Sequence, residues 1–332
     1  MVTLRVLLPG LLIGASGGSH GCGPAQKTHD AGVNDTPDGA PLDFTADREA
    51  ETSCPVTAPS SRFAAWPLPD PTIRVGPTAQ DYDTSSTGVA VDRVTNLVWQ
   101  RNLDAETYSS SEAGTHCACL DLDGRSGWRL PTRMELISIV DFTRRSPAID
   151  PGVFPGTPDQ WFWTSSPVAD KPGFVWYIYF ETGFSKFIDG ESRYRVRCVR
   201  EADAGSDAKE PPSEHYRVAD GNVFDTRTGL TWQQTLDPTM RPWADATATC
   251  AALTFAGGGW RLPNMKELQS LVDEARADPA LDPTAFPDTP PDSFWTSTRV
   301  AGTTDSAWRV SFSQGYAYDE NVMYAYRARC VR

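Results

Sequence analysis

The sequence predicts two tandem globular domains, each combining helices with strands. Three observations lead to this prediction: a long internal duplication, the same order of helical and extended segments in both copies, and a short polar stretch between them. A duplicated block of this length is the size of an independent domain, much longer than a solenoid or propeller repeat. The landmarks Trp99, Trp128, Trp163, Trp176 and Cys198 return as Trp232, Trp260, Trp295, Trp308 and Cys330.

The spacing between equivalent positions hardly changes along the two copies. It is 133 residues from the pair Asp92/Asp225 to the pair Leu120/Leu253, and 132 residues from Trp128/Trp260 to the last residues of each copy. Positions that both copies keep are therefore expected to form the framework. Positions that differ are the better candidates for ligand contacts.

Each copy begins with a hairpin pattern, in which two short apolar runs flank a turn of polar residues. An Ala- and Cys-rich stretch suited to a helix follows. Thr132-x-x-Glu135 and Asn264-x-x-Glu267 are capping boxes, which predict a second helix start in each copy. The last seventy or so residues of each copy are rich in strand-type residues. The predicted hairpins cover 88–99 and 221–232, and the first helices cover 111–120 and 243–253.

The N-terminus has the pattern of an export signal. A short basic start is followed by an apolar run that is too short to span a bilayer, and then by small residues. Residues 1–22 are interpreted as a signal peptide whose end resembles a lipobox, so that Cys22 would carry the lipid. Residues 23–62, poor in apolar side chains, are expected to form a flexible tether. The predicted domains are then 63–200 and 214–332, joined by the linker 201–213.

Seven cysteines fit an oxidising compartment. Without Cys22 six remain, and Cys250 and Cys330 are the only two in the second copy, so we expect them to form a disulfide. Their counterparts Cys117 and Cys198 should pair in the same way, which leaves Cys54 for Cys119.

Charge excludes one class of partner. The net charge is −13, and the acidic excess is spread over the whole chain. Since neither copy is basic, the electrostatic footprint of a nucleic-acid-binding protein is absent, and a sulfated or phosphorylated polyanion is a poor default ligand.

The ordered set of shared residues resembles the Lcl C-terminal domain family, named after a bacterial collagen-like adhesin. The resemblance implies an α+β fold, with two tandem C-type-lectin-like or formylglycine-generating-enzyme-like domains that have twisted antiparallel sheets and flanking helices. The adhesin's domain is associated with glycosaminoglycan binding, and no collagen-like stretch precedes the copies here. The resemblance rests on Asp92, Thr95, Leu97, Trp99, Gln100, Cys117, Trp128-Arg-Leu-Pro131, Trp163-Thr-Ser, Trp176, Phe180, Gly183 and Arg197-Cys-Val-Arg200, with their counterparts in the second copy.

Catalysis finds little support in the shared residues. His116 aligns with Thr249, and no His occupies matching positions in both copies, so a duplicated Ser–His, Cys–His or zinc site is excluded. Glu135 and Glu267 are explained as capping residues, and Arg129 and Arg261 are expected to pair with a carboxylate.

We therefore expect a non-enzymatic, lipid-anchored or secreted envelope protein that binds glycan or a surface protein. The alternatives are a structural envelope protein without sugar binding and, less favoured, an enzyme with an unrecognised site. Aromatic residues that could stack on a sugar are Tyr177, Tyr179, Phe184 and Tyr316, and Trp161 differs between the copies because Ser293 replaces it. Calcium is a weak option at recurring aspartates such as Asp150 and Asp282.

Overall fold

The computed structural model describes residues 54–55, 80–202 and 214–332. The predicted signal peptide, Cys22, most of the tether and most of the linker between the copies lie outside the described residues, and Glu201, assigned to the linker, belongs to β7 instead. We call residues 80–202 repeat 1 and residues 214–332 repeat 2. Among the described residues, no helix is both long and apolar enough to cross a membrane.

Repeat 1 consists of short strands and two short helices, as the sequence predicts. Helix α2 begins after Thr132, whose side chain accepts a hydrogen bond from the Glu135 amide while the Glu135 carboxylate accepts from the Thr132 amide. This is the predicted capping box. The elements are β1 (Tyr82–Asp83), β2 (Val89–Asp92), β3 (Leu97–Gln100), α1 (Ser110–Ala118), α2 (Arg133–Ser138), β4 (Trp161–Pro167), β5 (Phe174–Tyr179), β6 (Phe184–Asp189) and β7 (Val199–Glu201).

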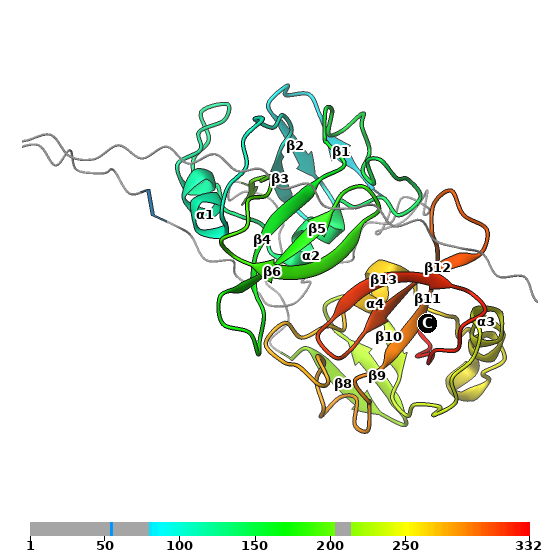
Figure 1. Cartoon of the computed structure of the whole chain (residues 1–332). Coiled ribbons are helices and arrows are strands. Elements are labelled where there is room, and N and C mark those ends of the chain that lie inside the picture. The colour runs from blue at the N-terminus through cyan, green and yellow to red at the C-terminus, as the bar shows by residue number, and fades with distance from the viewer. Residues whose placement is uncertain (1–53, 56–79, 203–213) are drawn as a thin grey trace, which may run out of the picture. The chain divides into compact units, whose positions relative to one another are not determined.

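Repeat 2 has helices and strands in the same order as β1 to β6 of repeat 1 (Figure 1). Within the described residues 214–332 there is no strand at the position of β7, because Val331 makes only isolated bridges. Its second capping box, Asn264 with Glu267, is also formed. A short 3-10 helix, η1 (Phe255–Gly257), has no counterpart in repeat 1. The elements are β8 (Tyr216–Ala219), β9 (Asn222–Asp225), β10 (Thr231–Gln233), α3 (Trp243–Ala251), α4 (Met265–Gln269), β11 (Ser293–Arg299), β12 (Ser306–Ser311) and β13 (Tyr316–Asn321).

All strand pairs within the sheets are antiparallel. Each repeat has its own small sheet, in the order β1-β2-β3-β7 in repeat 1 and β10-β9-β8 in repeat 2. The larger sheet is shared, with the order β11-β12-β13-β6-β5-β4. The predicted α+β class with antiparallel sheets is therefore confirmed at this level.

The shared sheet joins the repeats at equivalent positions. Strands β6 and β13 pair through Ser185 and Ala317, which are 132 residues apart in the sequence. Because an antiparallel pair of equivalent residues has the geometry of a two-fold axis, this contact has the form of an isologous dimer interface within one chain.

The core is built from the residues that the copies share. The eight tryptophans that recur are all at most 3% exposed. Arg197 and Arg329 are also fully buried, each donating a hydrogen bond of 2.6 Å to a buried threonine, Thr157 or Thr289. Burial lowers the pKa of both guanidinium groups, which have no carboxylate partner among the described residues.

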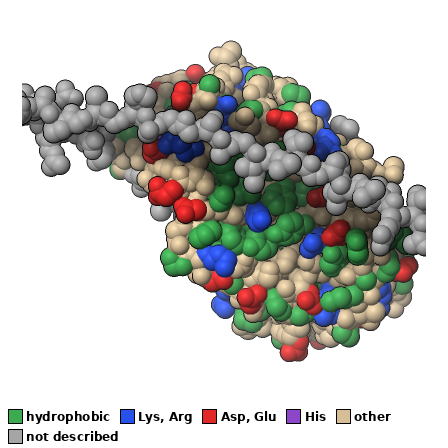
Figure 2. Space-filling view, in the orientation of Figure 1, with side chains coloured by type: hydrophobic (Ala, Val, Ile, Leu, Met, Phe, Trp, Pro, Cys, Tyr) green, Lys and Arg blue, Asp and Glu red, His purple; other side chains and the backbone are tan. Residues whose placement is uncertain are grey.

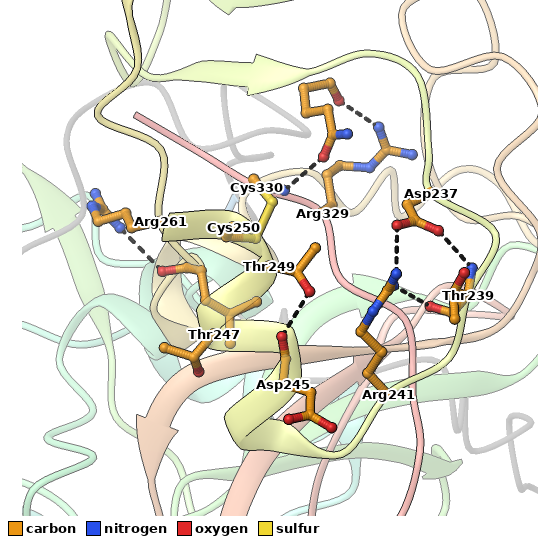
Figure 3. Close-up of a disulfide and its surroundings, with 12 residues drawn as sticks. Asp237, Thr239, Arg241, Asp245, Thr247, Thr249, Cys250, Arg261, Arg329 and Cys330 are labelled. Atoms are coloured by element: carbon orange, nitrogen blue, oxygen red, sulfur yellow. Dashed lines mark hydrogen bonds and ion pairs between the residues drawn. A yellow bond between two sulfur atoms is a disulfide. The ribbon is translucent and has the colours of Figure 1, made fainter. Parts of the chain in front are cut away.

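Three disulfides join the predicted pairs: Cys54–Cys119, Cys117–Cys198 and Cys250–Cys330. Figure 3 shows the repeat 2 bridge between helix α3 and the C-terminal segment. On the same helix the Thr249 hydroxyl donates to the Asp245 carbonyl, at 2.7 Å. The equivalent bridge in repeat 1 joins α1 to the segment before β7. Each bridge thus ties a helix near the start of a repeat to that repeat's end.

One segment differs from the sequence prediction. The strand-type residues at the end of the first copy predict a strand over 194–200, but a strand forms only from Val199 onward. The preceding residues make isolated bridges instead, including Tyr194 with Tyr108 and Arg195 with Phe162. These bridges place the segment along the outer edge of β4, because the Arg195 amide donates to the Trp161 carbonyl. The segment thereby covers a sheet edge that would otherwise have unpaired groups.

Candidate functional site

The shared polar residues serve the framework. The Arg129 guanidinium makes two hydrogen bonds of 2.7 Å to the Glu135 carboxylate, and Arg261 pairs with Glu267 in the same way. Each glutamate also completes its capping box. The oxygens of both carboxylates accept hydrogen bonds from the arginine and from the capped amide. The structural role of each Arg–Glu pair therefore accounts for its presence in both repeats.

The recurring aspartates act as turn residues. The Asp150 carboxylate accepts a hydrogen bond from the Gly152 amide at 2.9 Å, and Asp282 accepts from the amides of Thr284 and Ala285. Among the described residues, no group of three Asp, Glu, His or Cys side chains is arranged to hold a metal ion. The geometry therefore gives the weak calcium prediction at Asp150 and Asp282 no support.

Three of the four aromatic residues expected at a ligand surface make contacts within the protein. Tyr177 is only 8% exposed and belongs to the core, because it faces inward on β5. Phe184 packs against Tyr318, with ring centroids 5.2 Å apart, and so lies where the repeats meet. Tyr316 contacts Trp176 of the other repeat at 5.6 Å. Tyr177 is therefore buried, while Phe184 and Tyr316 are half-buried and make ring contacts between the repeats.

Tyr179 is part of an exposed aromatic surface at the outer strands of repeat 1. Its neighbour across the sheet is Trp161, the first residue of β4, which is 44% exposed. The two rings are stacked, with centroids 5.2 Å apart and an interplanar angle of 18°. Tyr194 lies against Trp161 at 5.5 Å and continues the row inward to the buried Trp163 at 4.8 Å. We call Trp161, Tyr179 and Tyr194 the aromatic platform.

Polar side chains surround the aromatic platform. The Arg195 guanidinium donates to the Gln160 side-chain oxygen at 2.7 Å and to the carbonyls of Asp104 and Glu106. On the other side, Glu181 pairs with Arg145 at 2.9 Å. The charges therefore come in both signs next to one flat apolar ring.

The Tyr179 hydroxyl stays protonated over the physiological range. A hydrogen bond to the Glu181 carboxylate, with burial as the second cause, raises the pKa of Tyr179 to about 12. The same interaction lowers the pKa of Glu181. The phenol therefore donates to Glu181 and keeps its oxygen lone pairs available as acceptors.

Repeat 2 lacks this surface. Ser293 and Ser311 occupy the positions of Trp161 and Tyr179. Arg309, at the position of Tyr177, donates a hydrogen bond of 2.6 Å to the Ser293 hydroxyl and stacks on Tyr326 at 4.6 Å. The equivalent place is thus polar and occupied by an arginine.

Figure 2 shows acidic, basic and hydrophobic side chains intermixed on the face in view, in keeping with the absence of a basic block in the sequence.

The sequence signalled part of the aromatic platform. The replacement of Trp161 by Ser293 marked a difference between copies, and Tyr179 was proposed from strand alternation. The sequence does not indicate a surface role for Tyr194 and Arg195. They directly precede the shared Arg-Cys-Val-Arg motif and are therefore assigned to the same strand as that motif. Tyr194 is also kept as Tyr326 in repeat 2, so a search for differences does not find it.

The comparison with protein-family models identifies one family, in two consecutive matches. The model described as the Lcl C-terminal domain matches residues 88–200 and 221–332, together about two thirds of the chain. These bounds coincide with the duplication and cover all the elements described above except β1, β8 and the last residue of β7. A search of curated proteins finds no significant match to the chain.

Proposed function

Because the chain belongs to the Lcl C-terminal domain family, we propose that it is a non-enzymatic, adhesin-like binding protein of the bacterial cell envelope. In this proposal the signal peptide exports the chain, and a lipid on Cys22 holds it to a membrane. Three disulfides support an oxidising compartment outside the cytoplasm. Each repeat is proposed to be a variant of the C-type-lectin-like or formylglycine-generating-enzyme-like fold.

The proposed ligand is a glycan with an exposed sugar ring, bound at the aromatic platform of repeat 1. The observation that carries this is Trp161, a large ring that is exposed yet held in place by stacking on Tyr179. An oriented indole face buries the apolar C–H face of a pyranose without paying much side-chain entropy. Glu181, which is hydrogen-bonded to Tyr179, lies beside the platform and can accept hydrogen bonds from sugar hydroxyl groups, and Gln160 and Arg195 are the chain neighbours of Trp161 and Tyr194.

A neutral or weakly charged glycan fits better than a sulfated one. The protein carries a net charge of −13, and the arginines beside the aromatic platform are already bound to carbonyls or to Glu181. Long-range attraction to a polyanion is therefore weak. Since repeat 2 lacks the platform, one binding site per chain is expected, and avidity would come from many anchored copies on a surface.

The first experiment is a glycan array with the chain from residue 23 onward, fully oxidised, with calcium and with EDTA. Trp161→Ala tests the aromatic platform, and Ser293→Ala at the equivalent position of repeat 2 is the matched control. Loss of the ring's buried apolar surface is expected to weaken binding about tenfold or more. The control variant should bind like the original protein, with or without calcium.

Two results would contradict the proposal in different ways. Equal binding by the Trp161→Ala variant and the original protein would move the glycan site away from the aromatic platform. A blank array with a folded, oxidised sample would favour the structural alternative. The search would then turn to protein partners, for which Met323 and Tyr324 of repeat 2, 78% and 60% exposed, offer an apolar contact.

A further inference from the structure

The interface between the repeats has two sides that the internal two-fold relation makes equivalent. On the first side, Arg133 of α2 is fully buried and lies over the Trp176 ring at 4.4 Å. Its guanidinium donates to the Glu274 carboxylate of repeat 2 at 2.9 Å and to the Gly315 carbonyl at 2.6 Å. An ion pair, one hydrogen bond to a backbone carbonyl and a contact with the Trp176 ring thus fill this corner.

On the second side the equivalent residues are apolar. Met265 takes the position of Arg133, and Phe142 takes the position of Glu274. Phe142 packs its edge against Trp308 of the other repeat, with centroids 5.4 Å apart. No ion pair crosses between Met265 and Phe142 on this side. A pocket of about 380 Å³ lies here instead. Its wall includes Phe142, Met265, Val300, Ala301, Thr298 and Arg299.

The pocket has an apolar floor and a cationic rim. Met265, Phe142 and Val300 are each at most 6% exposed, so they form its inner surface. Arg299 is exposed at its edge, stacked on Trp243 at 4.0 Å and donating to the Thr304 carbonyl. No carboxylate of the described residues is paired with Arg299 within salt-bridge distance, and no acidic residue belongs to the pocket wall. The equivalent of Arg299 in repeat 1 is Pro167.

The hydroxyl groups on the wall add directional contacts. Thr298 accepts a hydrogen bond from the Met265 amide at 2.9 Å, which leaves its own hydroxyl hydrogen to be donated toward an anion. Ser297 and Thr143, from opposite repeats, are exposed at the same pocket. A volume of this size lies within the range of small-molecule sites.

We propose that this pocket binds a small amphipathic organic anion. Its apolar body would rest on Phe142, Met265 and Val300, and its acidic group would meet Arg299 and the Thr298 hydroxyl. The ligand would contact both repeats and so stabilise the arrangement of the shared sheet by mass action. This site is separate from the aromatic platform, whose residues do not belong to the pocket wall, and it does not depend on glycan binding.

The test uses two fluorescent probes of nearly the same shape on the full, oxidised chain. 8-Anilinonaphthalene-1-sulfonate carries the acidic group, and N-phenyl-1-naphthylamine is its uncharged analogue. Ala301→Trp fills the pocket, and Ala169→Trp places the same ring at the equivalent position of repeat 1. Arg299→Gln removes the exposed cation of the pocket and leaves Phe142, Met265, Val300 and the buried Lys266 unchanged.

Saturable binding of the sulfonate at one site per chain is expected. Ala301→Trp should abolish it, while Ala169→Trp should leave it unchanged. Arg299→Gln should weaken the sulfonate about tenfold and the uncharged probe less than twofold, since one charged contact is worth about that much. Equal effects of the two tryptophan variants, equal effects of Arg299→Gln on both probes, or no saturable binding would each overturn the proposal. Trp161→Ala should leave sulfonate binding unchanged, so failure here is distinguishable from failure of the glycan site.

Discussion

Repeat 1 and repeat 2 share a framework but differ at two surfaces. The buried tryptophans, the capping boxes, the Arg–Glu pairs and the long disulfides occur in both. The exposed face of the outer strands is aromatic in repeat 1 and polar in repeat 2, with Ser293 in place of Trp161. The interface corner holds the Arg133–Glu274 ion pair on one side and a pocket on the other. The two copies therefore share the residues that stabilise the fold and differ at the exposed strands and at the interface corner.

The largest expected effect concerns the part that the repeats share. Cys117→Ala with Cys198→Ala opens a loop of 81 residues, and Cys250→Ala with Cys330→Ala opens one of 80. In the chain-entropy model each loss destabilises the protein by about 4–5 kcal/mol. Guanidinium denaturation of the oxidised variants should give nearly equal losses. A loss confined to one pair would show that the two frameworks are not energetically equivalent.

The second prediction concerns the side of the interface that the ion pair fills. Glu274→Gln leaves the Arg133 guanidinium buried without a carboxylate, at a cost of about 3 kcal/mol. The matched change on the pocket side, Phe142→Leu, removes only packing and should cost about 1 kcal/mol. Denaturant unfolding measures both.

A third variant separates the charge from the contact. Adding Arg133→Met to Glu274→Gln removes the unpaired charge and copies the pocket side, so part of the lost stability should return. If the double variant is no more stable than Glu274→Gln alone, the cost comes from lost packing and not from the buried charge.

The sequence predicted the framework well for a physical reason. Two copies of one domain work as an alignment, and their matching residues are those that packing and capping restrict most, such as Trp128, Thr132 and Glu135. The disulfides followed from the same comparison, because only one pair exists in the second copy. The order of helices and strands followed from local periodicity and caps, which short-range interactions decide.

The sites could be predicted only in part. Tyr177 and Tyr179 both looked suitable on one strand, yet Tyr194 and Trp163 cover the first and leave the second at the surface. Phe184 and Tyr316 differ between the copies because of the contact between repeats, which local sequence does not encode. The pocket forms where Phe142 of repeat 1 lies near Met265 of repeat 2, and the ion pair forms where Arg133 meets Glu274. Such long-range pairing becomes visible only in the folded chain.

Transplanting the aromatic platform sharpens the comparison further. Ser293→Trp with Ser311→Tyr gives repeat 2 the two outer rings of repeat 1, next to the existing Tyr326. Arg309 loses its hydrogen bond to Ser293 but keeps its contact with Tyr326 and its ion pair with Glu320. In a Trp161→Ala background we expect this variant to recover part of the roughly tenfold lost glycan affinity. Recovery would be measured on the same array, and none at all would show that the polar neighbours Gln160 and Glu181 are also required.

The smallest effect distinguishes two buried aspartates at equivalent positions. Burial raises the pKa of the Asp92 carboxyl, so the folded state disfavours its charge. The wild-type protein therefore loses stability as the pH rises from the unfolded value, about 3.9, through the raised folded value, and the loss is complete above it. Asp92→Asn keeps an acceptor for the Val94 and Thr95 amides and removes the charge.

Relative to the wild-type protein, Asp92→Asn should therefore be more stable at pH 7 than at pH 4, by a difference on the order of 1 kcal/mol. Asp225→Asn is the matched control, because the His215 ring nitrogen lies 3.3 Å from the Asp225 carboxylate and pairs with it. Asp225→Asn loses this contact and should therefore be destabilised. Thermal or denaturant unfolding at pH 4 and pH 7 measures the four cases. An Asp92→Asn variant that loses relative stability as the pH rises would show that the hydrogen bonds from Thr95 and Val94, together with the Lys266 charge, outweigh the cost of burial.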